Sequence, residues 1–300
     1  MKDLKFLLVI ILFALFASIF SLQKMSLNYS EPFFLIGFRM IFAGLILLFY
    51  NFYRCFTIPS IKIEHIKFFI YLSIYHIYLT NIFEIWGLNN MSSAKACMIY
   101  SLSPFITAVI AFFILKESIT KKKTIGMFFG FLGLIPMLFF KTYEEYNVDT
   151  FFIFSFSEIS LILSVLFSVL GWVFLKKIIK LGYSFIFANS ISMFFGGFFI
   201  LIHSYLCGEN WNPFPIFNIK YFFIYTLITC IISNVICYNL FGFLLTYFST
   251  TFMTFSGLMT PFFASFFGWM FLNELITWHF FLSIFLFFIG FLIFYSEEKN

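Results

Sequence analysis

The chain carries the stretch Ser103-Pro104-Phe105 followed by Glu117-Ser118-Ile119-Thr120, and later repeats this order as Thr260-Pro261-Phe262 followed by Glu274-Leu275-Ile276-Thr277. In each copy the glutamate follows the proline by 13 residues, and a glycine, Gly133 or Gly290, follows the glutamate by 16. One offset of 157 residues relates all of these positions. A chain of 300 residues that repeats itself at about half its length is expected to consist of two related halves.

The composition indicates a membrane protein. Hydrophobic residues make up 62% of the chain, charged residues 10%, and the mean hydropathy is +1.02. A typical soluble domain carries roughly 25% charged residues, and a soluble fold could not cover this much apolar surface. The 55 phenylalanines, together with many Ile, Tyr, Asn and Lys residues, also suggest a bacterium with an AT-rich genome.

Ten apolar stretches follow one another along the sequence, each near the roughly 20 residues that a helix needs to cross a bilayer. Their continuous apolar character favours helices over the alternating strands of a barrel. The first stretch is interpreted as a retained helix rather than a signal peptide, because no clean cleavage site follows it. The expected spans are 5–22, 33–53, 67–87, 92–115, 122–140, 152–175, 184–206, 219–244, 250–272 and 278–295.

The distribution of Lys and Arg predicts the orientation. With the N-terminus inside, 13 of these residues lie on the cytoplasmic side and four on the outer side, while Arg39 falls within a span. This is a strong positive-inside bias, and ten spans then place both termini in the cytoplasm. The net charge of +5 reflects this topology rather than nucleic-acid binding.

We predict an all-α polytopic membrane protein with two five-helix repeats, residues 1–141 and 152–300, joined by a polar connector at 142–151. Because five is odd, the repeats run in opposite directions across the membrane. Glu117 is then expected at the inner face and Glu274 at the outer face. Inverted repeats are typical of secondary transporters, whose site lies between the halves near the middle of the membrane.

Two ionisable residues inside the expected spans are candidates for substrate binding, because a charge in the bilayer interior costs several kcal/mol. The Arg39 guanidinium is suited to bind a carboxylate through two hydrogen bonds. Glu84 is suited to hold a cationic group or to carry a proton, and Asn81 and Tyr78 lie near the same helical face. The alternative is a structural pair between Arg39 and Glu84.

The eighth span carries Asn234 and Tyr238 on a partly polar stripe. Asn234 and Asn81 occupy related positions in the two halves, so the third and eighth spans are expected to line the cavity as a pair. Trp172 and Tyr238 are candidates for stacking against a flat ligand. Hydrogen bonding between helices explains the two asparagines equally well.

The repeated prolines and glutamates are expected to have structural and gating roles. Pro104 and Pro261 would break or kink the fourth and ninth spans near mid-membrane, where the kinks act as pivots and freed carbonyls face the cavity. Glu117 and Glu274 lie at turns, where each would favour the positive end of the following helix. Thr120 is well placed to cap that helix in the first half.

Enzyme and cofactor motifs are missing from the sequence. It contains no P-loop, zinc-type cysteine spacing, serine elbow or dinucleotide-binding fingerprint. Neither an enzymatic activity nor a metal site or cofactor is therefore expected. The five cysteines are interpreted as small core residues. The expected partners are a small-molecule substrate and membrane lipids.

Taken together, these residues resemble the EamA family of the drug/metabolite transporter superfamily. The resemblance rests on Pro32–Arg39 in the second span, on Ser93–Ala96 leading to Pro104 and Glu117, and on the repetition of that element after Thr250. It implies ten helices in two inverted five-helix repeats and secondary transport by alternating access across a bacterial inner membrane. The seventh span has no counterpart of Arg39.

Some members of this family in obligate intracellular bacteria take up S-adenosylmethionine, and the ending Phe294–Lys299 and the AT-rich composition resemble those proteins. The resemblance implies uptake of S-adenosylmethionine in exchange for S-adenosylhomocysteine. Arg39, Glu84 and an aromatic wall would receive the amino-acid head, the sulfonium and the adenine respectively. The alternatives are an exporter of amino acids, drugs or other metabolites, and, in another class, a lipid-carrier flippase or a non-transporting membrane subunit.

Overall fold

The computed structural model describes residues 2–55, 60–89, 96, 99–139, 156–211, 214–272 and 278–298. Helices account for nearly all of these residues, and within the described ranges the only strand-like pairing is an isolated bridge between Ser30 and Ile216. The elements are α1 (Lys2–Ser26), η1 (Leu27–Tyr29), α2 (Pro32–Cys55), α3 (Ile63–Tyr71), η2 (Leu72–Leu79), α4 (Thr80–Asn89), α6 (Ser103–Leu115), α7 (Lys121–Phe139), α8 (Phe156–Lys180), α9 (Phe185–Leu206), α10 (Ile219–Thr229), η4 (Cys230–Cys237), α11 (Tyr238–Leu244), α12 (Thr250–Ser256), η5 (Gly257–Met259), α13 (Thr260–Leu272) and α14 (Trp278–Glu298).

The helices have the length and composition of a multi-pass membrane protein. Helix occupies part of each of the ten expected apolar stretches. In the described part of the chain, five continuous helical stretches are long and apolar enough to cross a bilayer: Pro32–Arg54, Ile63–Leu88, Phe156–Lys180, Phe185–Leu206 and Ile219–Leu244. Shorter apolar helices cover Lys5–Ile19, Ser103–Leu115 and Phe281–Glu297.

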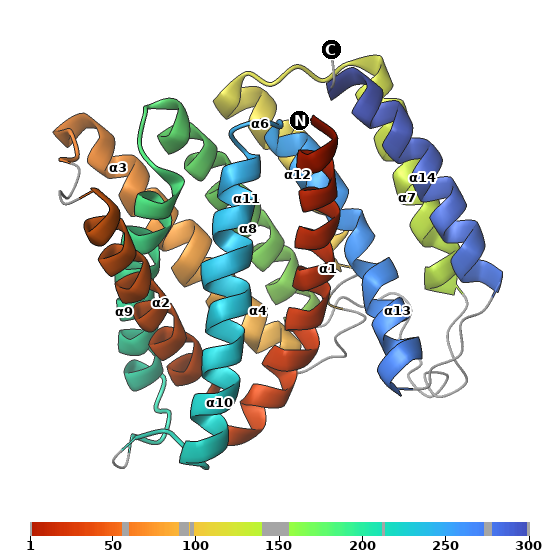
Figure 1. Cartoon of the computed structure of the whole chain (residues 1–300). Helices are drawn as coiled ribbons and strands as arrows, with labels where there is room; N and C mark the ends of the chain where they lie inside the picture. The colour runs from red at the N-terminus through yellow and green to blue at the C-terminus, as the bar shows by residue number, and fades with distance from the viewer. Residues whose placement is uncertain are drawn as a thin grey trace.

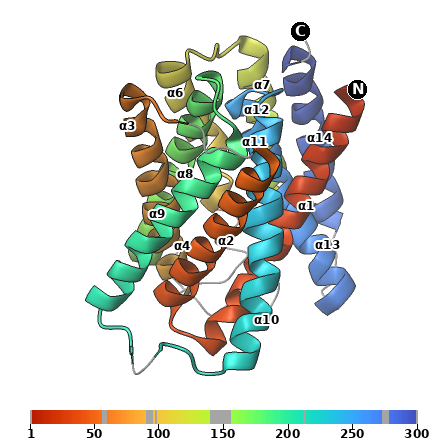
Figure 2. The same ribbon diagram turned by 60° about the vertical axis from the view of Figure 1, so that its left-hand side comes forward.

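The helices form one bundle with both chain termini at the same end (Figure 1). A view turned by 60° shows α2 and α9 running side by side (Figure 2). Their backbones approach closely, because a Cβ atom on Gly44 would lie 2.6 Å from the Phe194 backbone nitrogen and one on Gly197 would lie 2.8 Å from that of Ile41. Small residues at such positions allow helices in lipid to pack tightly.

The helices α7 and α14 pack against each other along one edge of the bundle (Figure 1). A Cβ atom on Gly133 would meet backbone atoms of Ser283 and Phe287, and one on Gly290 would meet those of Gly126 and Gly130. At the 157-residue offset, Ser283 corresponds to position 126 and Phe287 to position 130. The contact is therefore reciprocal, as at a two-fold axis.

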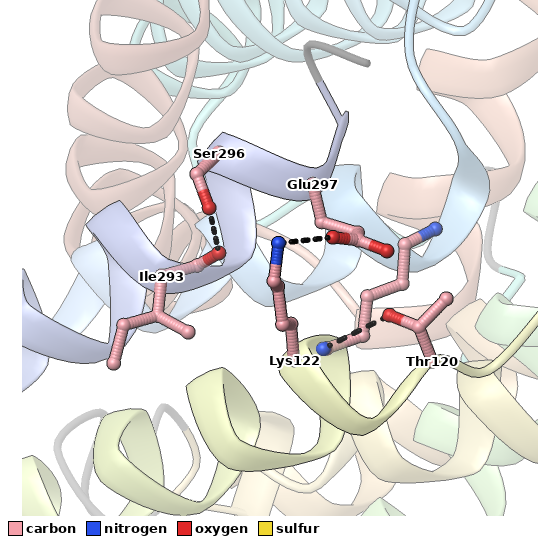
Figure 3. Close-up of polar contacts among 6 residues, drawn as sticks. Thr120, Lys122, Ile293, Ser296 and Glu297 are labelled. Atoms are coloured by element: carbon pink, nitrogen blue, oxygen red, sulfur yellow. Dashed lines mark hydrogen bonds and ion pairs between the residues drawn. The ribbon is translucent and has the colours of Figure 1, made fainter.

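Polar contacts connect the start of α7 with the end of α14 (Figure 3). Lys122 on α7 forms an ion pair with Glu297 on α14 at 3.3 Å. The Lys122 side chain is 62% exposed, so the pair contributes at most about 1 kcal/mol. The Thr120 hydroxyl accepts a hydrogen bond from the Lys123 backbone N–H at 3.3 Å, which confirms that Thr120 caps α7.

The expected helix breaks at the two prolines are present. Helix α6 begins at Ser103 with Pro104 in its first turn. Helix α13 begins at Thr260, directly before Pro261, after the 3₁₀ turn η5 has interrupted the preceding helix. Proline is tolerated in a first turn because its missing N–H has no partner there.

Two further interruptions have no counterpart in the sequence analysis. The segments η2 and η4 are π-helical, and each covers eight residues in the third long helix of its half. Their first residues, Leu72 and Cys230, lie 158 positions apart, close to the repeat offset. A π-helical turn contains more residues than an α-helical one, so it rotates the side chains that follow, and such segments are frequent at functional sites.

Candidate functional site

A cavity of about 140 Å³ lies inside the bundle, beside the helix breaks. Its wall includes residues of α1, α2, α4, α8 and α11, together with Ser103, Gly257 and Thr260 from the starts of α6, η5 and α13. Five residues proposed from the sequence lie in this wall: Arg39, Asn81, Glu84, Trp172 and Tyr238.

Arg39 projects from the first half of α2 and is only 2% exposed. Its Nη1 donates a long hydrogen bond of 3.5 Å to Oε1 of Gln23 on α1, and its Nε has no partner. Among the described residues no acidic oxygen lies within ion-pair distance of this guanidinium. A buried cation with unused donors is costly in lipid, so Arg39 has the properties of a ligand-binding group.

Glu84 on α4 forms a hydrogen-bonded chain with two hydroxyl groups. The Tyr100 hydroxyl lies 2.8 Å from Glu84 Oε2 and 2.8 Å from the Ser164 hydroxyl, which lies 2.9 Å from the Thr80 carbonyl oxygen. Tyr100 donates to Glu84 and Ser164 donates to the Thr80 carbonyl oxygen, so the Glu84 carboxylate is the acceptor at one end of this chain.

Aromatic rings form another part of the wall. The Trp172 ring stacks on Phe241 with centroids 3.8 Å apart, and Tyr238 lies 5.3 Å from Trp172. Behind them, the buried ring of His76 lies 4.1 Å from Trp172 and makes no hydrogen bond through either nitrogen. The cavity therefore combines charged groups with apolar ring surfaces.

Tyr78 and Asn234 do not line this cavity, contrary to the sequence prediction. The Tyr78 hydroxyl lies 3.2 Å from His203 Nδ1, and both residues line a separate hollow between η2 and α9. Asn234 is buried in η4, where its side-chain nitrogen contacts the Met40 sulfur at 3.1 Å. Both residues belong to π-helical segments, where side-chain directions differ from those of a regular α-helix.

Gln23 and Tyr100 are cavity residues that the sequence analysis missed. Gln23 is the single glutamine of the chain, and a lone amide in an apolar span is a signal that could have been used. Tyr100 is one of 16 tyrosines and carries no such signal. It lies shortly before α6, and only the folded bundle brings its hydroxyl to Glu84 on α4 and Ser164 on α8.

Glu117 caps a helix of the other half rather than the helix that follows it. Its carboxylate accepts hydrogen bonds from the Thr250 and Thr251 backbone N–H groups at 3.0 and 3.3 Å, and from the Thr251 hydroxyl at 3.0 Å. The sequence analysis expected Glu117 to act at the start of α7, whereas its hydrogen bonds go to the start of α12. Glu274 lies outside the described residues.

Glu209 makes a similar cap at the opposite end of the bundle, where α2 begins (Figure 1). Its carboxylate accepts from the Phe33 and Phe34 backbone N–H groups at 2.7 and 2.9 Å, and from the Ser204 hydroxyl. Each half thus supplies a carboxylate that neutralises free donors at a helix start in the other half.

Replacing Glu117 with alanine is expected to lower the unfolding free energy by about 2 kcal/mol, because three hydrogen bonds to a charged acceptor are lost at a helix start. The thermal midpoint in detergent should fall by roughly 5 °C. Glu64→Ala, at an exposed position in α3, serves as the control. Equal midpoints for the two variants would contradict the capping role.

Glu31, directly before α2, is expected to reduce stability at neutral pH. Burial, and then the neighbouring Glu209 carboxylate, raise the pKa of Glu31 above its usual value. A raised pKa means that folding disfavours the ionised form, so stability falls as the pH rises. Glu31→Gln should therefore raise the thermal midpoint slightly at pH 7, and this advantage should vanish near pH 4. A pH-independent difference would contradict the assignment.

Comparison with known proteins identifies the family. The EamA-like transporter family matches residues 4–139 and 155–296. An S-adenosylmethionine/S-adenosylhomocysteine transporter of Chlamydia muridarum is 36% identical over 264 residues, covering 87% of this chain and 81% of the relative. The protein of the same name from Chlamydia trachomatis serovar L2 is 36% identical over 266 residues, covering 87% and 79%.

A solved crystal structure shares the fold, with a TM-score of 0.75 and 12% sequence identity over the full length of both chains. The family and its named members are transporters, which agrees with a lipid-embedded helical bundle around a polar cavity and separates this chain from enzymes. The chain therefore belongs to the EamA-like transporter family and is a multi-pass membrane transporter.

Proposed function

We propose that this protein takes up S-adenosylmethionine in exchange for S-adenosylhomocysteine, and that the substrate binds in the cavity at Arg39 and Glu84. The observation that carries the proposal is a buried guanidinium, Arg39, and a partly buried carboxylate, Glu84, in one cavity without an ion pair between them. In the bilayer interior such groups call for a ligand that carries both charges. The named function of the Chlamydia relatives supports the choice of substrate.

The cavity offers complementary chemistry to each part of this substrate. The planar Arg39 fork suits the substrate carboxylate. Glu84 suits a cationic group, and Asn81 adds a polar side chain beside it. Trp172 and Tyr238 provide ring surfaces for the flat adenine.

The halves, residues 1–141 and 152–300, are proposed to be inverted five-helix repeats that contribute ten spans. Both termini would lie in the cytoplasm of a bacterium, with the spans in its inner membrane. The excess of Lys and Arg on one side supports this orientation. The reciprocal contact between α7 and α14 supports the division into two related halves, with these helices as outer struts.

Transport would proceed by alternating access, with Pro104 and Pro261 as pivots. The cavity of about 140 Å³ is smaller than the roughly 300–1,000 Å³ of most small-molecule sites, so the halves must separate to admit an adenosyl group. The caps at Glu117 and Glu209 join the halves at opposite ends of the bundle. Opening one end would break one cap and leave the other closed.

The test is uptake of labelled S-adenosylmethionine by liposomes that contain the purified protein and are loaded with unlabelled S-adenosylhomocysteine. We expect saturable uptake that falls sharply when the internal S-adenosylhomocysteine is omitted. Uptake that does not depend on the internal molecule would contradict exchange. No uptake by a correctly folded protein would contradict the substrate and favour an amino-acid or metabolite exporter of the same fold.

A further inference from the structure

We propose that Arg39, Gln23 and Glu84 together bind the α-amino-acid head of the substrate, with Glu84 receiving its ammonium group, and that the sulfonium lies against aromatic rings. This inference rests on the proposed function and refines the assignment of Glu84 to a cationic group. Its consequence is that S-adenosylmethionine and S-adenosylhomocysteine are recognised through the part that they share.

The three side chains are arranged around a small volume. Gln23 accepts a hydrogen bond from Arg39, and its amide lies close enough to the Glu84 carboxylate for a weak hydrogen-bonding interaction. The Arg39 Nε has no partner and the Gln23 amide nitrogen makes no hydrogen bond of normal length, although Gln23 is only 3% exposed. Two available donors next to one carboxylate match a group in which a carboxylate and an ammonium share a single carbon atom.

Hydrogen-bond requirements decide which cation Glu84 receives. An ammonium group has three N–H donors, and burying them without acceptors is costly. Among the described residues that line the cavity, Glu84 is the only one with a carboxylate. If Glu84 held the sulfonium instead, the ammonium would enter the cavity without an anionic partner.

A sulfonium has different needs, because its sulfur is bonded to three carbon atoms and carries no N–H or O–H group. It requires no hydrogen-bond acceptor, and the face of an aromatic ring stabilises a cation of this kind. Trp172, Tyr238 and Phe241 form such a surface in the same cavity, and the inference places the sulfonium, rather than the adenine, against these rings. The neutral thioether of S-adenosylhomocysteine packs equally well on apolar rings.

Competition against labelled S-adenosylmethionine tests the inference in the unaltered protein. S-Adenosylhomocysteine should compete within about 3-fold of S-adenosylmethionine, because the two share the head group. N-Acetyl-S-adenosylhomocysteine and methylthioadenosine should each compete at least ~10-fold more weakly, since each lacks the ammonium and a charge-assisted bond is lost. Strong competition by both head-group-deficient compounds would overturn the inference.

The variant Glu84→Gln separates the two assignments of the carboxylate. We expect it to lower the affinities for S-adenosylmethionine and S-adenosylhomocysteine by the same factor, about 10- to 100-fold, because both lose the partner of their ammonium. If the affinity for S-adenosylmethionine falls at least ~10-fold more than that for S-adenosylhomocysteine, Glu84 receives the sulfonium and the inference fails. Trp172→Leu should show the opposite pattern, with the larger loss for S-adenosylmethionine.

Glu64→Gln is the matched control, because it removes an exposed carboxylate on α3 by the same substitution. Folding of each variant is checked by its elution profile as a fluorescent fusion. If Glu84→Gln does not fold, the competition series in the unaltered protein decides the question alone. Absence of any uptake by the unaltered protein overturns the proposed function. Uptake that compounds without the ammonium group inhibit as strongly as S-adenosylhomocysteine does overturns only this inference.

Discussion

Replacing Arg39 with alanine is expected to abolish uptake of S-adenosylmethionine, with a loss of at least ~100-fold in initial rate. The guanidinium is buried in α2, makes one long hydrogen bond to Gln23 and lines the cavity. Without it, a substrate carboxylate would enter the bilayer interior unpaired, and that costs several kcal/mol. Initial rates in liposomes give the measurement.

The conservative variant sharpens this prediction. Arg39→Lys keeps the charge but loses the planar fork, so we expect a loss of about 10-fold or more. Arg54→Ala, at the exposed end of α2, should transport normally. Normal uptake by Arg39→Lys would show that charge alone suffices.

A purely structural role for Arg39 makes a different prediction. A guanidinium that held the bundle together would lower the thermal midpoint strongly when removed, by roughly 3 kcal/mol or more in unfolding free energy. Because Arg39 has few partners, we expect the Arg39→Ala midpoint to stay within a few degrees of the original. A large drop, reversed by adding Glu84→Gln, would instead establish a structural pair.

Replacing Gly290 with leucine is expected to prevent correct folding. A Cβ atom there would lie 2.5 Å from the Gly126 carbonyl oxygen and 2.6 Å from the Gly130 nitrogen. These are backbone atoms, which cannot rotate away as a flexible side chain does, so the helices must separate at a cost above ~3 kcal/mol. Yield and monodispersity of a fluorescent fusion measure the effect.

The control for this prediction lies on the same helix. Leu292 is 53% exposed on α14, so Leu292→Ala should leave yield and elution profile unchanged. Gly290→Ala should fall between the two variants, because it adds a single methyl group to the same contact. A normal profile for Gly290→Leu would show that the α7–α14 contact does not determine folding.

The sequence predicts the helical stretches and their breaks well, because hydrophobicity and proline act locally. Each expected apolar stretch contains helix, and new helices begin beside Pro104 and Pro261. The partners of Glu117 lie more than 130 residues away, so no local pattern indicates them. Packing alone decides that α12, rather than the adjacent α7, receives this carboxylate.

The candidate site could be predicted only in part, because some of its residues carry a local signal and others are placed by packing. Arg39 and Glu84 are identified by their charge inside apolar spans, and both line the cavity. Tyr78 and Asn234 lie in π-helical segments and outside the wall of this cavity. A π-helical turn depends on the packing around it rather than on a sequence signal, so the directions of these side chains could not be predicted.

The reciprocal glycine contact between α7 and α14 has an evolutionary consequence. At the repeat offset, each half touches the other through the same set of positions, which is how two identical chains meet in a symmetric dimer. An ancestral chain of half this length could therefore have paired with a second copy of itself before duplication and fusion joined them. Under this hypothesis the fused halves were free to diverge, which accounts for the lack of a counterpart of Arg39 in the second half.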